Sequence, residues 1–554
     1  MKKTICLLLL LSLYRIQVCG QTTGVLCERI YLQTDKQLYL AGECVHIKAL
    51  TTTPERIPLS FSKIVYVELL DTANALLQIK IGLTGGVGEG WMILPSNLTS
   101  GYYRLIAYTR HMRNESPGVF LEKTIGVVNT FQPALSNLPV PSDDRRDIAP
   151  PKADRNMEQN PLPLTLSKPL FACREEGWLR LEGIPDDIHT LSVAITGKSP
   201  IQMPADGLLQ WYEQVKPASE SLSGHFIPEY EGHIVTGQLT ALEGHDNPGG
   251  DLRAFLCIPG VQPRLFSGVR NHTGVTFYLT DITDVSELIT ITSDSSNNYR
   301  IDLQSPFIRQ HPSKQLPELT IDSTHLDELL KRSIALQLMP ILTKDLPVKN
   351  NTTNTFFNME PTKTYLLDEY SRFPKMDELI LEFVLGVRFR MRDGNREIIM
   401  IDVRGNEKPW ITPLVLLDGI PIKNHELIYR YNPLLVERID IFMKEYLFGG
   451  VKYDGILSFS TYKHNYPELK LDDTYRIFDY AGTQAHYTPL FTGNKWQPDF
   501  RHTLLWNPAV HTAGKSSVQI PFHTSDYTGD FTVTVEGITK GGIPVYATAS
   551  FIVK

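Results

Sequence analysis

The chain has 554 residues, with 54 lysines and arginines against 61 aspartates and glutamates, and a formal net charge of −7. This acidic balance, with no basic tract, argues against nucleic acid as a partner. The length predicts about three to five domains. Since 42% of the residues are hydrophobic, and apolar residues alternate more often than they follow helical spacing, we expect a mainly β multidomain fold.

Residues 1–20 read as a secretory signal peptide. Lys2 and Lys3 form a charged start, Leu7–Leu13 an apolar core, and small residues precede the cleavage point after Gly20. A membrane anchor is disfavoured because the apolar run is too short to span a bilayer. A lipoprotein signal using Cys19 is disfavoured because valine precedes it. We expect an exported protein with no transmembrane segment in its mature chain.

Four cysteines remain beyond the signal: Cys27, Cys44, Cys173 and Cys257. Export permits disulfides, and Cys27 with Cys44 is then the favoured pair because both fall in the first predicted domain. The alternative is that all four are free buried thiols, since the core needs no covalent link. No Cys-x-x-Cys is present, so the sequence gives no support for a redox or zinc motif.

Residues 21–130 form the first predicted domain. Its alternating segments around Glu28–Lys36 and Tyr39–Leu50 are typical of strands joined by turns. They resemble the opening "Y-x-x-T-D-K-x-x-Y-x-x-G-x-x-V" of the macroglobulin domains of the alpha-2-macroglobulin superfamily, matched here by Tyr31, Thr34, Asp35, Lys36, Tyr39, Gly42 and Val45. The resemblance implies a β-sandwich in which Asp35 and Lys36 set a turn and Gly42 permits an unusual backbone angle.

The middle of the chain predicts two more sandwiches. Residues 131–160 are a Pro-rich linker. Residues 161–225 predict a second macroglobulin-like sandwich, and 226–320 open with a "G-x-I-x-x-G-x-L" run that resembles transthyretin-like or carboxypeptidase-regulatory sandwiches. Residues 321–359 predict a helix and linker. The helix has an apolar packing stripe at Leu326, Leu329, Leu330, Ile334, Leu336 and Leu338.

Residues 360–480 mix helical and strand patterns. A helix is predicted at Lys375–Val384, followed by apolar runs at Trp410–Ile422, Asn432–Phe442 and Gly449–Thr461. In that order the three runs resemble the plug domain of TonB-dependent outer-membrane receptors. The resemblance implies an α+β unit. Asp418-Gly419 is interpreted as a tight turn rather than a site.

About 90 residues follow that unit, too few for the receptor's barrel by the usual length of a tilted strand. Transport is therefore not expected. Residues 481–554 alternate cleanly and again resemble a macroglobulin-like sandwich.

We find no catalytic constellation in the sequence. The Cys-Gly-Glu-Gln run of thioester-containing macroglobulins is missing, as are His-Glu-x-x-His and Gly-x-Ser-x-Gly. Gly514-Lys515-Ser516 is interpreted as a hairpin turn rather than part of a phosphate-binding loop. The remaining candidates lack metal-ligand spacing or catalytic context: His225, His233, His245, His272, Asp186-Asp187 and Asp472-Asp473. We expect no catalytic, cofactor-binding or metal residues.

The resemblances together imply a non-enzymatic, exported interaction or scaffold protein of the Bacteroidota cell envelope, in the periplasm or at the outer membrane. Its partner would be an envelope protein such as an outer-membrane transporter, in a nutrient-uptake system. The alternative is a secreted peptidase inhibitor or polymer hydrolase. Export and the macroglobulin resemblance favour that alternative, whereas the absent catalytic motifs oppose it.

Overall fold

The computed structural model describes residues 26–131, 161–199, 201, 203, 207–218, 223–242, 244–245, 252–260, 263–280, 287–293, 298–321, 325–342, 360–392, 394–401, 410–448, 450–479 and 498–554. The predicted signal peptide, and the predicted linker beyond Phe131, lie outside these residues. Among the described residues the fold is mainly β, in several sheets, as predicted. No helix in this part of the chain is long and apolar enough to cross a membrane.

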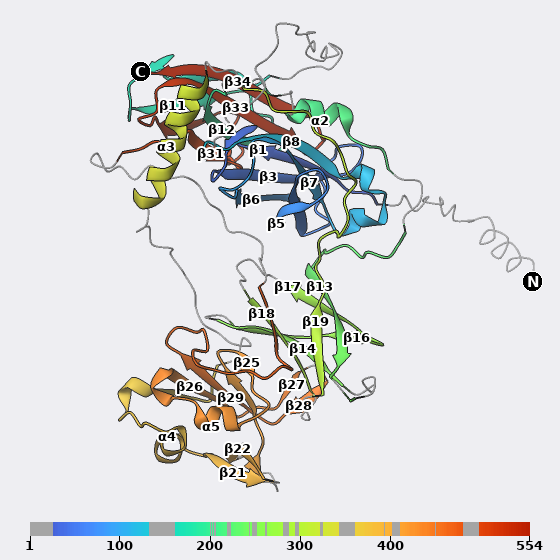
Figure 1. The fold of residues 1–554 in the computed structure, drawn as a ribbon, viewed down its shortest axis with the longest axis vertical. Coiled ribbons are helices and arrows are strands. Elements are labelled where there is room, and N and C mark those ends of the chain that lie inside the picture. The colour runs from blue at the N-terminus through green and yellow to red at the C-terminus, as the bar shows by residue number, and fades with distance from the viewer. Residues whose placement is uncertain are drawn as a thin grey trace, which may run out of the picture.

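The molecule has two lobes, and the chain passes between them more than once (Figure 1). One lobe holds two sandwiches and the helix α3. The other holds a third sandwich and the α+β unit.

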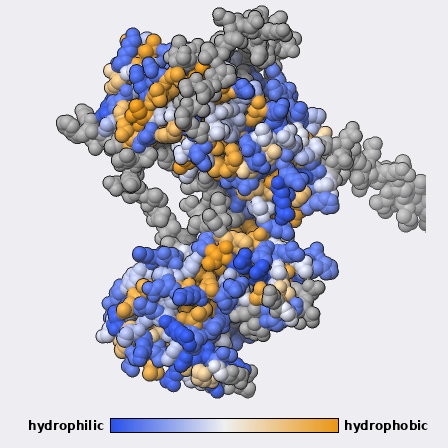
Figure 2. Space-filling model, in the orientation of Figure 1, coloured by the Kyte–Doolittle hydropathy of each residue, from blue (hydrophilic) through white to orange (hydrophobic). Residues whose placement is uncertain are grey.

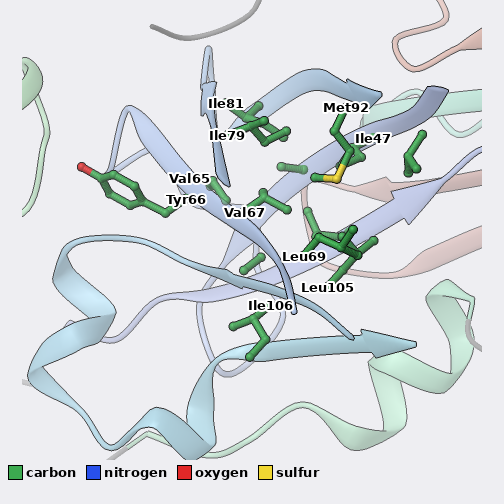
Figure 3. Packing of buried hydrophobic residues seen from close by; sticks show 14 of the residues in the cluster. Ile47, Val65, Tyr66, Val67, Leu69, Ile79, Ile81, Met92, Leu105 and Ile106 are labelled. Carbon is green, nitrogen blue, oxygen red and sulfur yellow. The ribbon is translucent and has the colours of Figure 1, made fainter. Parts of the chain in front are cut away.

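The first sandwich faces a three-stranded sheet against a five-stranded one, in the orders β1-β3-β6 and β2-β8-β7-β4-β5. Its elements are β1 (Arg29–Thr34), β2 (Leu38–Leu40), β3 (Cys44–Thr52), β4 (Ile64–Leu70), β5 (Ala75–Gly82), β6 (Val87–Ile93), β7 (Gly101–Tyr108), η1 (His111–Asn114), η2 (Pro117–Val119) and β8 (Leu121–Val128). Side chains such as Ile47, Val67, Met92 and Leu105 meet between the sheets (Figure 3). The period-2 apolar pattern of the strands places these residues on the inner faces.

The second sandwich is built from two distant segments. One sheet has the order β10-β34-β33-β12-β31 and the other β32-β11-β9. The strands are β9 (Leu164–Leu166), β10 (Leu170–Phe171), β11 (Glu176–Leu181), β12 (Ile188–Gly197), β31 (Thr503–Asn507), β32 (Val518–His523), β33 (Gly529–Thr539) and β34 (Pro544–Val553). The prediction of separate sandwiches at 161–225 and 481–554 is therefore wrong. Each segment contributes strands to both sheets, and neither segment closes a core alone.

The third sandwich also takes a strand from elsewhere. Its sheets have the orders β16-β17-β13-β19 and β15-β14-β18-β30. The strands are β13 (Gly232–Ala241), β14 (Ala254–Ile258), β15 (Arg264–Ser267), β16 (Val269–Asn271), β17 (Gly274–Thr280), β18 (Glu287–Thr292), β19 (Tyr299–Leu303) and β30 (Arg476–Asp479). The sequence predicts residues 360–480 as one unit, but β30 within that range pairs with β18 of the third sandwich.

The third sandwich ends before the predicted boundary at residue 320, because the chain after β19 returns to the other lobe. Phe307 and Ile308 pack on the core of the first sandwich. Leu319 and Ile321 join the cluster around Leu38.

The α+β unit centres on a mixed five-stranded sheet in the order β20-β26-β29-β24-β25. A second sheet has the order β21-β22-β23, and β27 pairs with β28. The elements are β20 (Lys363–Leu366), η6 (Leu367–Glu369), α4 (Met376–Phe383), β21 (Val387–Arg392), β22 (Asn395–Ile401), β23 (Trp410–Ile411), β24 (Leu414–Leu417), β25 (Ile420–Pro421), α5 (Glu426–Arg430), η7 (Pro433–Leu435), β26 (Val436–Phe442), β27 (Tyr446–Phe448), β28 (Val451–Tyr453) and β29 (Ile456–Thr461). The helix predicted at Lys375–Val384 is confirmed as α4.

Two helices lie outside that unit, α2 (Leu208–Gln214) and α3 (Leu326–Leu342). Helix α3 confirms the predicted helix, and its packing stripe in part, because Leu326, Leu329 and Leu336 pack in the cluster around Leu38. Leu329 is 1% exposed, whereas Leu330, Ile334 and Leu338 are 45%, 59% and 40% exposed. Figure 2 shows hydrophobic surface in the region of α3. The buried side of α3 instead includes Arg332, which is 4% exposed. Its guanidinium donates a hydrogen bond to the Glu43 carboxylate of the first sandwich.

Of the two alternatives for the cysteines, the pairing of Cys27 with Cys44 is wrong, and the alternative of four buried thiols holds only in part because Cys173 is exposed. β1 and β3 run antiparallel, with Arg29 opposite Thr52 and Thr34 opposite Ile47. Cys27 precedes Arg29 and Cys44 precedes Ile47, so the register places the two thiols at opposite ends of the strand pair. Burial, with the nearby Asp35 carboxylate, raises the pKa of Cys44 to about 12, which keeps this thiol protonated and unreactive near neutral pH.

Candidate functional site

The Asp418-Gly419 pair forms the tight turn between β24 and β25. Both residues have positive φ, 47° and 86°, the conformation that a two-residue type I′ hairpin requires. The Asp418 carboxylate accepts hydrogen bonds from the Thr461 amide, the Thr461 hydroxyl and the Tyr466 amide, each at 2.7 Å. All of its described contacts hold the hairpin against the next strand, so the turn interpretation is confirmed.

The same hairpin touches the third sandwich. A Cβ added at Gly419 would overlap the ring of Pro263, so the backbone approaches the neighbouring unit as closely as glycine allows. Tyr475, just before β30, donates from its hydroxyl to the Pro421 carbonyl at 2.9 Å. The hairpin therefore forms a contact between the α+β unit and the third sandwich.

A cleft of about 470 Å³ lies beside this contact. The third sandwich and the α+β unit both line it, through Phe255, Leu265, Ile291, Thr292, Ser293, Asn395, Arg396, Glu397, Thr412, Pro413, Leu414, Val415, Pro421, Ile422, Lys423, Asn424, His425, Phe448, Val451 and Tyr453. Its size and its position between two units are typical of ligand sites. Six residues of the predicted run Trp410–Ile422 line it, so the stretch that marks the plug-like pattern also forms a wall of the cleft.

Charged side chains at the cleft are held in place by neighbours. Arg396 bonds to the Glu426 carboxylate at 2.9 Å and lies over the Tyr429 ring, 3.7 Å from its centroid. Lys423 donates from Nζ to the Thr474 hydroxyl at 3.2 Å. These contacts fix charged groups, to which Glu397 adds an anion, beside an apolar wall, an arrangement suited to a ligand with both polar and apolar parts.

His425 is a cleft residue that sequence reasoning missed. The Ile398 amide donates to its Nδ1 at 2.8 Å, and burial lowers its pKa to about 4. The ring is therefore neutral near pH 7 and cannot supply a proton as an imidazolium. As a lone histidine followed by an ordinary helix pattern, it carries no motif that could have marked it.

The four histidines considered in the sequence do not come together. His225, His245 and His272 are exposed. His233 is buried, with its Nε2 3.7 Å from the Glu229 carboxylate, and burial lowers its pKa well below the usual value. Within the described part of the chain, no group of His, Cys, Asp or Glu side chains is arranged to hold a metal ion.

The other candidate residues lie in turns. Ala513 and Gly514 have positive φ, and the Lys515 amide donates to the Thr512 carbonyl. This agrees with a turn between β31 and β32. Asp472 accepts from the Thr474 amide at 2.9 Å, a local turn contact.

The Thr-Asp-Lys motif of the first domain forms a second polar centre. Asp35 is buried and accepts from the Tyr39 hydroxyl at 2.7 Å and from the Thr503 hydroxyl of β31 at 2.8 Å. The expected turn role is therefore only part of its function, because Asp35 also joins the first two sandwiches.

Glu43 extends this centre to α3. Its carboxylate accepts from Arg332 Nε at 2.7 Å and Nη2 at 2.5 Å, and Lys36 Nζ lies 3.3 Å away. Burial alone would raise the pKa of Glu43, but the charges of Arg332 and Lys36 lower it to about 2. Two sandwiches and a helix thus meet at one buried ionic network.

A smaller cavity of about 290 Å³ lies along the same interface. The Glu536 carboxylate at its edge accepts from the Tyr31 hydroxyl at 2.6 Å and from the Leu208 amide at 3.1 Å. Burial lowers the pKa of the nearby Lys48 to about 7, although the Glu536 charge opposes that shift. Described contacts already engage Glu536 on both oxygens, so we prefer the larger cleft as the candidate site.

Comparison with known proteins gives structural matches only. No protein-family model and no curated protein matches the sequence. A Salmonella alpha-2-macroglobulin reacted with methylamine matches with a TM-score of 0.24 and 10% identity, over 95% of this chain and 39% of that one. An Escherichia coli alpha-2-macroglobulin activated by porcine elastase matches with a TM-score of 0.23 and 8% identity, over 95% and 43%.

The Escherichia coli adhesin FdeC matches with a TM-score of 0.14 and 9% identity, over 48% of this chain and 58% of that one. The chain thus spans about two fifths of the bacterial macroglobulins it matches. At these TM-scores the superpositions assign no residue a functional role.

Proposed function

We propose that this chain is a non-enzymatic scaffold of the bacterial cell envelope that binds a partner in the cleft between the third sandwich and the α+β unit. The cleft itself carries the proposal: its volume is in the range of ligand sites, and fixed charged groups lie beside an apolar wall. Its one histidine accepts a backbone hydrogen bond and stays neutral, which fits binding better than acid–base chemistry.

The way in which the units are joined supports a scaffold. Strands from distant segments share sheets, and buried polar contacts such as Asp35 with Thr503 join one sandwich to another. Such junctions favour fixed surfaces over independently moving domains. The predicted signal and the plug-like pattern support a partner in the envelope, such as an outer-membrane transporter in a nutrient-uptake system, with the chain in the periplasm or at the outer membrane.

The cleft can be tested by filling it. Thr412 lines the cleft and is exposed, so Thr412→Trp adds volume there without disturbing a core. Thr165→Trp makes the same change at an exposed position on β9 and serves as the control. Each protein is used to capture partners from envelope extract, and the captured proteins are quantified by mass spectrometry.

We expect at least one partner that the wild type and Thr165→Trp retain and Thr412→Trp loses. Equal capture by all three proteins would contradict binding in the cleft. Peptidase-inhibition and glycan-hydrolysis assays test the alternative function, in which the protein is a secreted peptidase inhibitor or polymer hydrolase. Reproducible turnover that a single carboxylate substitution abolishes would overturn the non-enzymatic proposal.

A further inference from the structure

Strand β21 is an edge strand at the foot of the lower lobe in Figure 1. It pairs antiparallel with β22 from Val387 opposite Met400 to Arg392 opposite Asn395. Among the described residues, no backbone amide of residues 388–392 donates outside this pairing. An edge strand leaves the N–H and C=O groups of alternate residues directed outward, where a further strand can pair.

One face of β21 is basic. Arg388, Arg390 and Arg392 occur at alternate positions, so they share one side of the sheet. Arg392 lies 3.7 Å from the Glu397 carboxylate, and Arg388 lies over the Trp410 ring at 5.9 Å. Arg390 is exposed and forms no ion pair within the described residues. Glu397 is directly opposite Arg390 on β22, so three arginines share one carboxylate on this face among the described residues, and the row keeps a net positive charge.

The opposite face is apolar and open at one end. Val387 is buried and Phe389 partly buried, but Met391 is 59% exposed. Leu385, in the connection from α4, is 72% exposed. A strand added at this edge would therefore meet arginines with one row of its side chains and apolar surface with the other.

We propose that the free edge of β21 binds an extended segment of a partner protein in which acidic residues alternate with apolar ones. Backbone hydrogen bonds to the edge supply sequence-independent affinity, and the alternating side chains supply specificity. Acidic residues opposite Arg388 and Arg390 neutralise the basic row, and apolar residues cover Met391.

Charged edges often protect a sheet from pairing with its own copies. The arginines do disfavour a second copy of this chain, because two β21 strands would bring like charges together. Protection alone does not account for the exposed Met391 on the other face. The combination favours an acidic, amphipathic strand over a second copy.

The test uses the full chain and a capped, fluorescently labelled peptide of alternating glutamate and valine, with binding followed by anisotropy. We expect the wild type to bind, and Arg390→Glu to weaken binding by about tenfold or more, because attraction becomes repulsion. Arg309→Glu changes an exposed arginine that lies between β19 and α3 and makes the same change in net charge. This control should bind like the wild type.

A second peptide, N-methylated at every residue, cannot donate a backbone hydrogen bond from either edge and should not bind. Absence of binding to the wild type, equal weakening by both arginine variants, or equal binding of the N-methylated peptide would each overturn the proposal. No residue of β21 lines the cleft, although Glu397 of the neighbouring β22 does, so Thr412→Trp should bind the peptide like the wild type. If the peptide does not bind at β21, the proposal that a partner binds in the cleft is not affected.

Discussion

Buried carboxylates at Asp35, Glu43 and Asp418 hold distant parts of the chain together. Each lies in a short polar motif that is typical of a turn, and each also bonds a residue far away in the sequence. The turns were predictable because Asp, Gly and Lys at those spacings are local signals. The distant partners were not, because no local pattern pairs Glu43 with Arg332, 289 residues away.

Gly419 should be sensitive to a single added methyl group. Gly419→Ala combines an unfavourable positive φ with overlap at Pro263, so we expect a loss of about 2 to 4 kcal/mol in the free energy of unfolding. Gly394 also has positive φ but nothing within 4 Å of the added Cβ. Gly394→Ala should therefore cost only about 1 kcal/mol. Similar losses in urea unfolding of the two variants would argue against the close contact with Pro263.

Glu43 should make the stability of the protein depend on acid pH. Its pKa falls from 4.5 to about 2 on folding, so the ionised form is favoured in the folded state. The stabilisation is present above pH 4.5 and is lost as the pH falls toward about 2. The free energy of unfolding, measured with urea at several pH values in that range, should change less with pH for the double variant Glu43→Gln, Arg332→Met than for the wild type. Equal slopes would show that the pair is not ionised as described.

At the scale of elements, the sequence predicted which segments are strands better than which faces are buried. Alternation is a local property, so β12 and β33 could be predicted from their own residues. The α3 stripe packs only in part, and apolar spacing alone cannot reveal the buried Arg332 beside it. The cleft was equally hidden, since its two walls belong to segments more than a hundred residues apart.

Helix α3 provides a direct check of its observed orientation. Leu329 packs with Leu38 and Val128, so Leu329→Ala should lower the free energy of unfolding by about 2 to 5 kcal/mol. Ile334 is 59% exposed, so Ile334→Ala should change it by no more than about 0.5 kcal/mol. A larger loss for Ile334→Ala in thermal or urea unfolding would mean that the helix presents its other face to the sandwich.

At the scale of the whole molecule, the fold is discontinuous. β12 lies between β31 and β33, which are more than three hundred residues further along the chain. Residues 161–225 and 481–554 each carry complete strand patterns, so the sequence predicts them as two separate domains. Pairing between them depends on edges and cores that exist only once both are folded.

A designed disulfide can test this arrangement. Ala194 and Thr534 are directly opposite on β12 and β33, and both line the smaller cavity, so there is space for two sulfurs. Cysteines at both positions should cross-link on mild oxidation, because opposite Cα atoms on antiparallel strands lie about 4.5 to 5.5 Å apart, within the range that a disulfide spans. The cross-link is detected by peptide mapping, with Ala194→Cys alone as the control. Absence of the cross-linked peptide would contradict the shared sheet.

The central claim is that the cleft beside the Asp418-Gly419 hairpin binds a partner without turnover. Its most direct test is calorimetric titration of a purified captured partner into the wild type, Thr412→Trp and Thr165→Trp, with the partner recovered and weighed by mass spectrometry. We expect saturable binding to the wild type and Thr165→Trp, loss of binding to Thr412→Trp, and an unchanged partner mass. Unaltered affinity for Thr412→Trp, or a cleaved partner, would contradict the account.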